Sequence, residues 1–305
     1  MSNRPETLDR PLLGILFMLG FCVLAPLGDA MAKLLGATVP LVLLLFSRFA
    51  IQTLLLWPLV LAGRLRFWTG ERMFALLFLR SALHIVGIGA MFASLRYLPL
   101  ADAVAIAFVM PFIMLLLGKL VLGEEVGPHR LSACAVGFCG TLLVIQPNFV
   151  EVGAPALLPL VVAVVFALFM LVTRMLAKTV DPIALQAVSG AQASLLLLPA
   201  VLFWPGEPLG QSYDATTLML IGTMGVLGTG AHLLMTWSLR FAPAATLAPM
   251  QYLEIPVSTL IGWLIFRDLP NGLAAVGIAV TIAAGLYIIT RERTIARRLR
   301  GPAVP

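Results

Sequence analysis

The sequence is poor in charged residues and in cysteine. Only 11% of its 305 residues are Asp, Glu, Lys or Arg, whereas a soluble domain carries about 25%. A chain with so little charge cannot cover the surface of a soluble domain. The three cysteines, Cys22, Cys134 and Cys139, lie within apolar stretches. They give no disulfide framework or metal-binding spacing, so we expect small packing residues.

The motifs of common catalytic and metal sites are also missing. The sequence contains neither His-Glu-x-x-His nor Gly-x-Ser-x-Gly. The Leu-Gly-Lys stretch at 117–119 is not a nucleotide-binding loop, because no Gly stands five residues before Gly118 and no Ser or Thr follows Lys119. We therefore expect no enzyme activity, no metal and no cofactor. A membrane-embedded enzyme is the alternative from a different class.

Long apolar runs are what the sequence has in abundance. Hydrophobic residues make up 61% of the chain, and several runs reach about 18 residues, enough for a helix to cross a bilayer. The runs are continuous, whereas the strands of a β-barrel would alternate. We predict an all-α polytopic membrane protein whose immediate partner is the lipid bilayer. Charged, Pro-rich and Gly-rich points divide it into ten transmembrane helices, at about 11–35, 39–62, 73–95, 99–121, 129–146, 155–177, 183–204, 216–238, 244–265 and 271–290.

Basic residues are distributed unequally between alternate loops. If the N-terminus is inside, most Lys and Arg residues fall on the inner side, including the arginines of "RERTIARRLR" (291–300). The outer loops then keep only Arg96 and Arg267. This positive-inside pattern predicts that both termini are cytoplasmic, in a bacterial-type inner membrane. The net charge of +6 therefore reflects membrane anchoring rather than binding of nucleic acid.

One short phrase occurs twice. "SLRYLPLADAV" (94–104) and "SLRFAPAATLA" (238–248) share Ser-Leu-Arg, an aromatic residue and a proline, and Arg96 is 144 residues from Arg240. The repeat divides the chain into halves, 1–148 and 149–305, of five spans each. Because five is odd, the second half must cross the membrane in the opposite sense. Two inverted five-helix repeats are typical of secondary carriers.

Several segments resemble the EamA-type drug/metabolite transporters. They are "FSRFAIQTLLLWPLVL" (46–61), the stretch 91–145, and "GWLIFRDLPNGLAAVGIAVTIAAGLYII" (262–289). Arg48, Pro99, Pro243 and Gly123-Glu124 match the family pattern, whereas Arg267-Asp268 replaces its second Gly-Glu. The resemblance implies ten helices and export of amino acids, related metabolites or drugs, without an ATPase subunit.

Two charged residues fall in the outer half of the first helical hairpin. Asp29 and Arg48 lie about eight and nine residues below the outer ends of their helices, so they can meet at about 12 Å depth. We interpret them either as a buried ion pair that fixes the hairpin or as a gate that holds a solute carboxylate. Lys33, one turn from Asp29, can compete for it or extend outward.

A second set of polar residues lies nearer the middle of the membrane. In the third helix, Arg80, His84 and Met91 share one stripe with Gly87 and Ser94. Lipid exposure of such a stripe would be costly, so we expect it to face protein or a water-filled cavity. For each histidine, a role in the core is the alternative to substrate binding. His232 in the eighth helix lies at a similar depth.

The ninth helix supplies further candidates. Glu254 is close to mid-membrane, where a carboxylate must be paired or protonated, so we predict that it binds substrate. If it shares its site with a proton or a substrate ammonium, it also provides coupling. Pro256 should free the carbonyl of Tyr252 for a polar solute. Trp237 and Tyr252 could form aromatic walls for the substrate.

The sequence as a whole predicts a secondary transporter that works by alternating access. The expected substrate is a small polar metabolite, above all an amino acid, and the expected direction is export. Protons are the coupling partner if Glu254 titrates during transport. The same fold carrying a cationic drug or a vitamin-like solute is the first alternative. A channel is another, although a channel does not need two opposed halves around one site.

Overall fold

The computed structural model describes residues 10–63, 65, 70–124, 126–144, 153–203, 212–267 and 272–299, and every element in these ranges is helical. The elements are α1 (Pro11–Leu35), α2 (Leu41–Ala62), α3 (Glu71–Ser94), α4 (Leu100–Ala107), α5 (Met110–Leu122), α6 (Pro128–Val144), the 3₁₀ turn η1 (Ala154–Leu157), α8 (Leu158–Ala177), α9 (Pro182–Leu202), α10 (Ala215–Phe241), α11 (Ala244–Gln251), α12 (Glu254–Ile261), the π-helical turn η2 (Gly262–Phe266) and α13 (Gly272–Leu299).

Seven helices in the described ranges are long and apolar enough to cross a membrane. They are α1, α2, α3, α4 with α5 taken together, α8, α9 and α10. The chain is therefore a multi-pass membrane protein. The last helix, α13, runs through residue 299, so most of the basic segment 291–300 continues the helix instead of following it.

Two of the predicted helices are broken in the middle. The expected helix 99–121 divides into α4 and α5 at Phe108–Val109, and the expected helix 244–265 divides into α11 and α12 at Tyr252–Leu253. The segments before the two breaks, α4 and α11, end at Ala107 and Gln251, which are 144 residues apart. Prolines follow each break within a few residues and cannot donate the backbone hydrogen bond that would continue the first segment.

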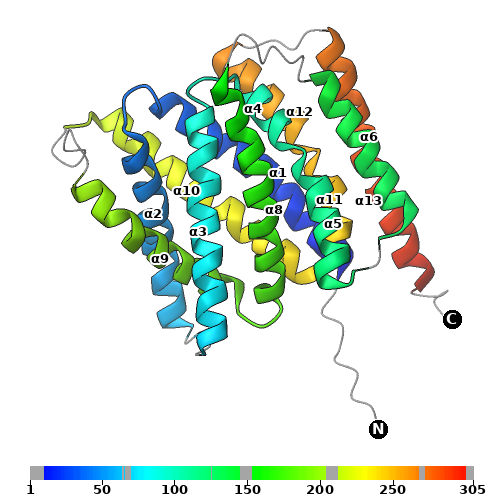
Figure 1. Ribbon diagram of the computed structural model, residues 1–305, viewed down its shortest axis with the longest axis horizontal. Coiled ribbons are helices and arrows are strands. Elements are labelled where there is room, and N and C mark those ends of the chain that lie inside the picture. Colours follow the sequence, from blue (N-terminus) through cyan, green and yellow to red (C-terminus); the bar gives the residue numbers. More distant parts are fainter. Residues whose placement is uncertain are drawn as a thin grey trace.

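Helices from the two halves of the chain pack in matching pairs. α1 lies along α10, α3 along α8, α2 against α9, and α6 against α13, with the last pair side by side at one edge of the bundle (Figure 1). α1 and α10 are antiparallel, since Gly14 lies beside Ala242 while Gly28 lies beside Gly228. A Cβ atom at Gly14 would come within 2.4 Å of the Ala242 Cβ, so only glycine permits this approach.

The two arginine phrases make the same kind of contact at opposite ends of the bundle. Arg96 donates to the carbonyl of Val39, just before α2, at 2.9 Å. Arg240 donates to the carbonyl of Val180, just before α9, at 3.4 Å. Because α1 and α10 are antiparallel, these corners lie at opposite ends. We call them the Arg96 end and the Arg240 end.

The Arg240 end is held together by a carboxylate. Glu124, between α5 and α6, pairs with Arg174 of α8 at 3.3 Å and accepts from the amide of Ala245 at 3.0 Å. Arg174 also donates to the carbonyl of Leu239 at 2.5 Å. At the Arg96 end Lys33 donates to the carbonyl of Leu98 at 2.7 Å. Glu124 therefore ties the first half of the chain to two elements of the second.

Candidate functional site

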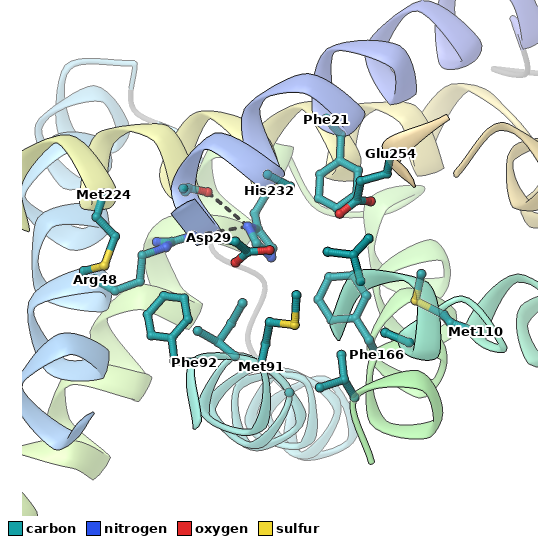
Figure 2. Close-up of a pocket in the computed structure, with 18 of the residues that line it drawn as sticks. Phe21, Asp29, Arg48, Met91, Phe92, Met110, Phe166, Met224, His232 and Glu254 are labelled. Atoms are coloured by element: carbon teal, nitrogen blue, oxygen red, sulfur yellow. Dashed lines mark hydrogen bonds between the residues drawn. The ribbon is translucent and has the colours of Figure 1, made fainter. Parts of the chain in front are cut away.

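A cavity lies among the helices between the middle of the bundle and the Arg96 end, and we call it the central cavity. The space in it that is open to the centres of water-sized molecules is about 70 Å³. Figure 2 shows the side chains that point into it, and those used below are Phe21, Asp29, Arg48, Met91, Phe92, Met110, Phe166, Met224, His232 and Glu254.

The position of the cavity follows from where its residues fall along the helices. Asp29 and Met91 are near the ends of α1 and α3 that reach the Arg96 end, while His232 and Glu254 are deeper in the bundle. Toward the Arg240 end the helices are closed by the Glu124 contacts. The central cavity thus lies nearer the Arg96 end than the Arg240 end.

Aromatic and methionine side chains form one part of its wall. Phe21 and Phe166 stack with ring centroids 6.5 Å apart, and each meets His232 edge-on at 5.9 and 5.8 Å. Met91 and Met110 complete the wall from α3 and α5. Such a surface suits a flat ring or an apolar side chain of a solute, because aromatic faces and thioethers make favourable contacts with rings.

Arg48 is held in a fixed orientation at one side of the cavity. Its guanidinium donates to Gln52 at 2.9 Å and lies 3.2 Å from Nδ1 of His232. A Cβ atom at Gly228 would lie 2.1 Å from the Arg48 Nε, so this glycine makes room for the guanidinium. Nδ1 of His232 also lies 3.0 Å from the carbonyl of Gly228, so this nitrogen can accept from Arg48 in one tautomer or donate to Gly228 in the other.

Two carboxylates face the same cavity from different helices. Asp29 projects from α1 and Glu254 from the first turn of α12, and Glu254 is 7% exposed (Figure 2). Asp29 and Arg48, predicted to meet, do line one cavity. Among the residues that the structure describes, neither carboxylate lies within 4 Å of an Arg48 nitrogen. The cavity thus presents groups of both charges with space between them.

The predicted stripe on α3 is divided by the structure. Gly87 and Met91 line the central cavity, whereas His84 and Arg80 are fully buried beneath it. Arg80 donates to Thr173 at 2.8 Å, to Gln186 at 3.0 Å and to Ser189, and its guanidinium lies 4.6 Å from the Phe169 ring centroid. His84 packs behind His232, with ring centroids 4.5 Å apart.

Trp237 and Tyr252 lie outside the central cavity. Trp237 packs against Phe17 with ring centroids 5.6 Å apart. The side chain of Tyr252 is fully buried against Gly137. The carbonyl of Tyr252, which we expected to be free, accepts from the amide of Ile255 at 3.2 Å. That expectation was wrong because the helix breaks at Tyr252 and a turn supplies a new donor.

Several wall residues are not apparent from the sequence. Phe21, Phe92, Phe166 and Met224 are apolar residues in apolar helices, so hydrophobicity does not separate a cavity wall from a lipid-facing surface. Met110 could have been found, because it precedes Glu254 by 144 residues.

Comparison with known proteins gives a family. The profile of the EamA-like transporter family matches twice, at residues 12–146 and 154–291. A riboflavin transporter of Rhizobium johnstonii is 32% identical over 73% of this chain and 72% of its own length. An S-adenosylmethionine uptake transporter of Rickettsia prowazekii is 25% identical, covering 94% of this chain and 96% of that protein.

Two further similarities extend over nearly the whole chain. A pseudopaline exporter of Pseudomonas aeruginosa is 27% identical over 95% of this chain and 96% of its own length. One crystal structure superposes with a TM-score of 0.69 at 20% identity, covering 95% of this chain and 98% of that one. At that identity the structural match supports the fold alone.

Proposed function

The chain belongs to the EamA-like transporter family, and on that premise we propose that it is a secondary carrier whose central cavity binds a small organic solute. The observation that supports this most strongly is the convergence of Asp29, Arg48, His232 and Glu254 on one cavity within helices that cross a membrane. Intramembrane charged groups are costly, and they usually mark a solute pathway.

We propose ten spans arranged as two inverted repeats. The equal breaks after Ala107 and Gln251 and the corner bonds of Arg96 and Arg240 support this reading. The two separate family matches, one in each of the predicted halves 1–148 and 149–305, support it too. With the predicted cytoplasmic termini in an inner membrane, the Arg96 end is periplasmic and the central cavity faces outward.

The lining favours a solute that joins a flat ring system to charged or polar groups. Phe21 and Phe166 offer ring faces, while Arg48 and Glu254 offer opposite charges across the cavity. Relatives are named for transport of riboflavin and of S-adenosylmethionine, both of which contain heteroaromatic rings. We therefore place the vitamin-like or nucleoside-like solute ahead of the amino acid first expected.

An amino-acid-derived solute is the second candidate. Arg48 can hold a carboxylate while Asp29 or Glu254 holds an ammonium, which is the requirement for a zwitterion. The relative named as a pseudopaline exporter is in keeping with export of such a compound. Because relatives are named for uptake as well as export, direction has to be measured. Glu254 is the proposed site of proton coupling, where its carboxyl group would bind and release a proton during transport.

Counterflow with purified protein in proteoliposomes tests the proposal. We expect exchange of labelled riboflavin or S-adenosylmethionine to exceed that of any common amino acid. Phe92→Trp, which fills the cavity, should reduce this exchange, whereas Phe78→Trp on the exposed side of the same helix should not. Exchange of none of these solutes, or equal effects of the two substitutions, would contradict the proposed site.

A further inference from the structure

Some buried polar atoms of this protein have no hydrogen-bond partner in the described part of the chain. They include both ring nitrogens of His84, Oε1 of Gln251 and the hydroxyl of Tyr252. All three side chains are fully buried, and none lines the central cavity. Because buried polar groups are nearly always paired, such groups need an explanation.

The internal repeat relates these residues to the wall of the central cavity. A shift of 144 residues matches positions in α3 with positions in α10. The same shift matches the broken helix α4–α5 with the broken helix α11–α12. Applied to the cavity wall, it takes Met224 to Arg80, Gly228 to His84, Ala107 to Gln251 and Phe108 to Tyr252. His84, Gln251 and Tyr252, which carry the unpaired atoms, thus occupy positions equivalent to residues in the wall of the central cavity.

The helices of each N-terminal hairpin need a slightly different shift. Pro58 near the end of α2 and Pro199 near the end of α9 are 141 residues apart, as are Val39 and Val180, which accept the two corner arginine bonds. The same shift takes Arg48 to Ser189.

The shift of 141 residues also applies to α1, whose counterpart in the second half is α8. There Gly28 corresponds to Phe169 and Asp29 to Met170.

The residues reached by these shifts contact one another. Arg80 donates to Ser189 and lies over the Phe169 ring, and His84 packs against the same ring at 4.4 Å. Nε2 of Gln251 lies 3.4 Å from Sδ of Met170. Neither shift depends on the contacts among these residues, so their contiguity in space is an independent observation. All are fully buried, on the side of the central cavity nearer the Arg240 end.

We propose that these residues form a second binding surface, which becomes exposed to the solute when the carrier opens at the Arg240 end. The surface consists of Arg80, His84, Phe169, Ser189, Gln251 and Tyr252. This inference rests on the proposed transport function and on its inverted repeats. In the second state the unpaired atoms of His84, Gln251 and Tyr252 gain water or solute as partners.

The chemistry of the second surface differs from that of the first. Arg80 has hydrogen bonds only to neutral groups, and no carboxylate lies within 4 Å of it among the described residues. It therefore offers a cation to an anionic or carbonyl-rich part of the solute. Glu254 and Met110 exchange places under the shift, so both stay beside the solute in either state.

Exposure of the second surface requires the Arg240 end to separate. Glu124 must leave both Arg174 and the amide of Ala245, its partners in the second half. The packing of α3 against α8 and α9, which now covers Arg80, must loosen as well. Access to the second surface should therefore come from the Arg240 side alone.

Cysteine labelling tests this surface. In a variant without its three native cysteines, Ser189→Cys places a thiol within the second surface. Met235→Cys places one beside it, at the buried position that the shift of 144 residues reaches from Met91 of the cavity wall; the two are the surface positions tested. Ser258→Cys in α12 is the matched control, because it is equally buried and lies outside the surface. A membrane-impermeant methanethiosulfonate is added to proteoliposomes from one side at a time. Lys178→Cys and Tyr97→Cys, exposed at opposite ends, report the sidedness.

We expect Ser189→Cys and Met235→Cys to react at least tenfold faster than Ser258→Cys from the Arg240 side, with slower reaction in saturating riboflavin or S-adenosylmethionine. Equal rates for the surface positions and the control, or reaction from the Arg96 side only, would overturn the second surface. Counterflow by the cysteine-free parent is measured separately. Counterflow with unreactive thiols rejects the second surface and leaves the proposed function intact, whereas absent counterflow of every solute rejects the function itself.

Discussion

The two broken helices have the same geometry and different chemistry. α4 gives way to α5 just as α11 gives way to α12, and the first residue after the break lines the central cavity in both cases. That residue is Met110 in the first half and Glu254 in the second. In the proposed repeat, the break is common to both halves, whereas the carboxylate is present in only one of them. A carrier whose halves exchange roles needs only one such carboxylate at the shared position.

Loss of the carboxylate should have the largest effect. We expect Glu254→Gln to reduce counterflow by roughly 10- to 100-fold, because hydrogen bonds of charged groups contribute about 1.5–3 kcal/mol and about 1.4 kcal/mol is a factor of ten. Met110→Gln introduces the same side chain at the matching position and should retain most activity. Similar losses in both variants, at equal folded yield, would show that Glu254 has no special role.

Crowding of Arg48 comes next in size. Gly228→Ala places a Cβ within 2.1 Å of the Arg48 Nε, which Gln52 and His232 hold in place. We expect a loss of about 1–3 kcal/mol in unfolding free energy, measured by denaturation in detergent, together with weaker solute binding. Gly222→Ala in the same helix meets no atom within 4 Å and should change neither quantity. A normal Gly228→Ala protein would mean that Arg48 is free to move.

The helices are largely predictable from the sequence, and the site is only partly so. α1 ends where the apolar run ends, because Gly36 and Pro40 interrupt it. The breaks at Phe108 and Tyr252 were missed, although Pro111 and Pro256 mark them. In a membrane helix, hydrogen bonds lost to proline can be replaced locally, so proline alone does not fix where a helix is interrupted.

Depth along a helix can be estimated from residue numbers, but direction around the helix axis cannot. His84 and His232 were placed at similar depth and do lie together. His232 lines the central cavity while His84 lies behind it, because neighbouring helices determine which side of each helix faces the space. Arg80 was also expected at the substrate site because of its depth along α3. Its contacts with α8 and α9 depend on its direction around the helix axis, which the sequence does not give.

The two corner arginines should have equal, smaller effects. Each donates one hydrogen bond to a backbone carbonyl at its own end of the bundle. We expect Arg96→Gln and Arg240→Gln each to lower the unfolding free energy by about 1 kcal/mol, with Lys119→Gln, an exposed cation of α5, as the control. An effect in one variant only would indicate that the corners are not equivalent.

The smallest expected effect concerns helix caps, which differ between the halves. Asp181 and Asp214 cap α9 and α10, whereas α1 to α5 have no side-chain cap. Hydrogen bonds from Thr217 lower the pKa of Asp214. Its stabilising effect is therefore present above the unfolded pKa of about 3.9 and is lost as pH falls through the lower folded value.

We expect Asp214→Ala to lower the melting temperature slightly at pH 7, and the difference from the unmodified protein should shrink at acid pH. Ser212→Ala, two residues earlier and also exposed, serves as the control. A difference that persists unchanged below the folded pKa would exclude the charged cap.

Transfer of the carboxylate between the halves tests the central claim most directly. The measurement is counterflow by Glu254→Met and by the double variant Glu254→Met/Met110→Glu, compared at equal folded yield. If the two breaks are equivalent positions at one shared site, the single variant is inactive and the double variant recovers a measurable part of transport. A folded double variant that is as inactive as the single variant would contradict the equivalence of the two breaks.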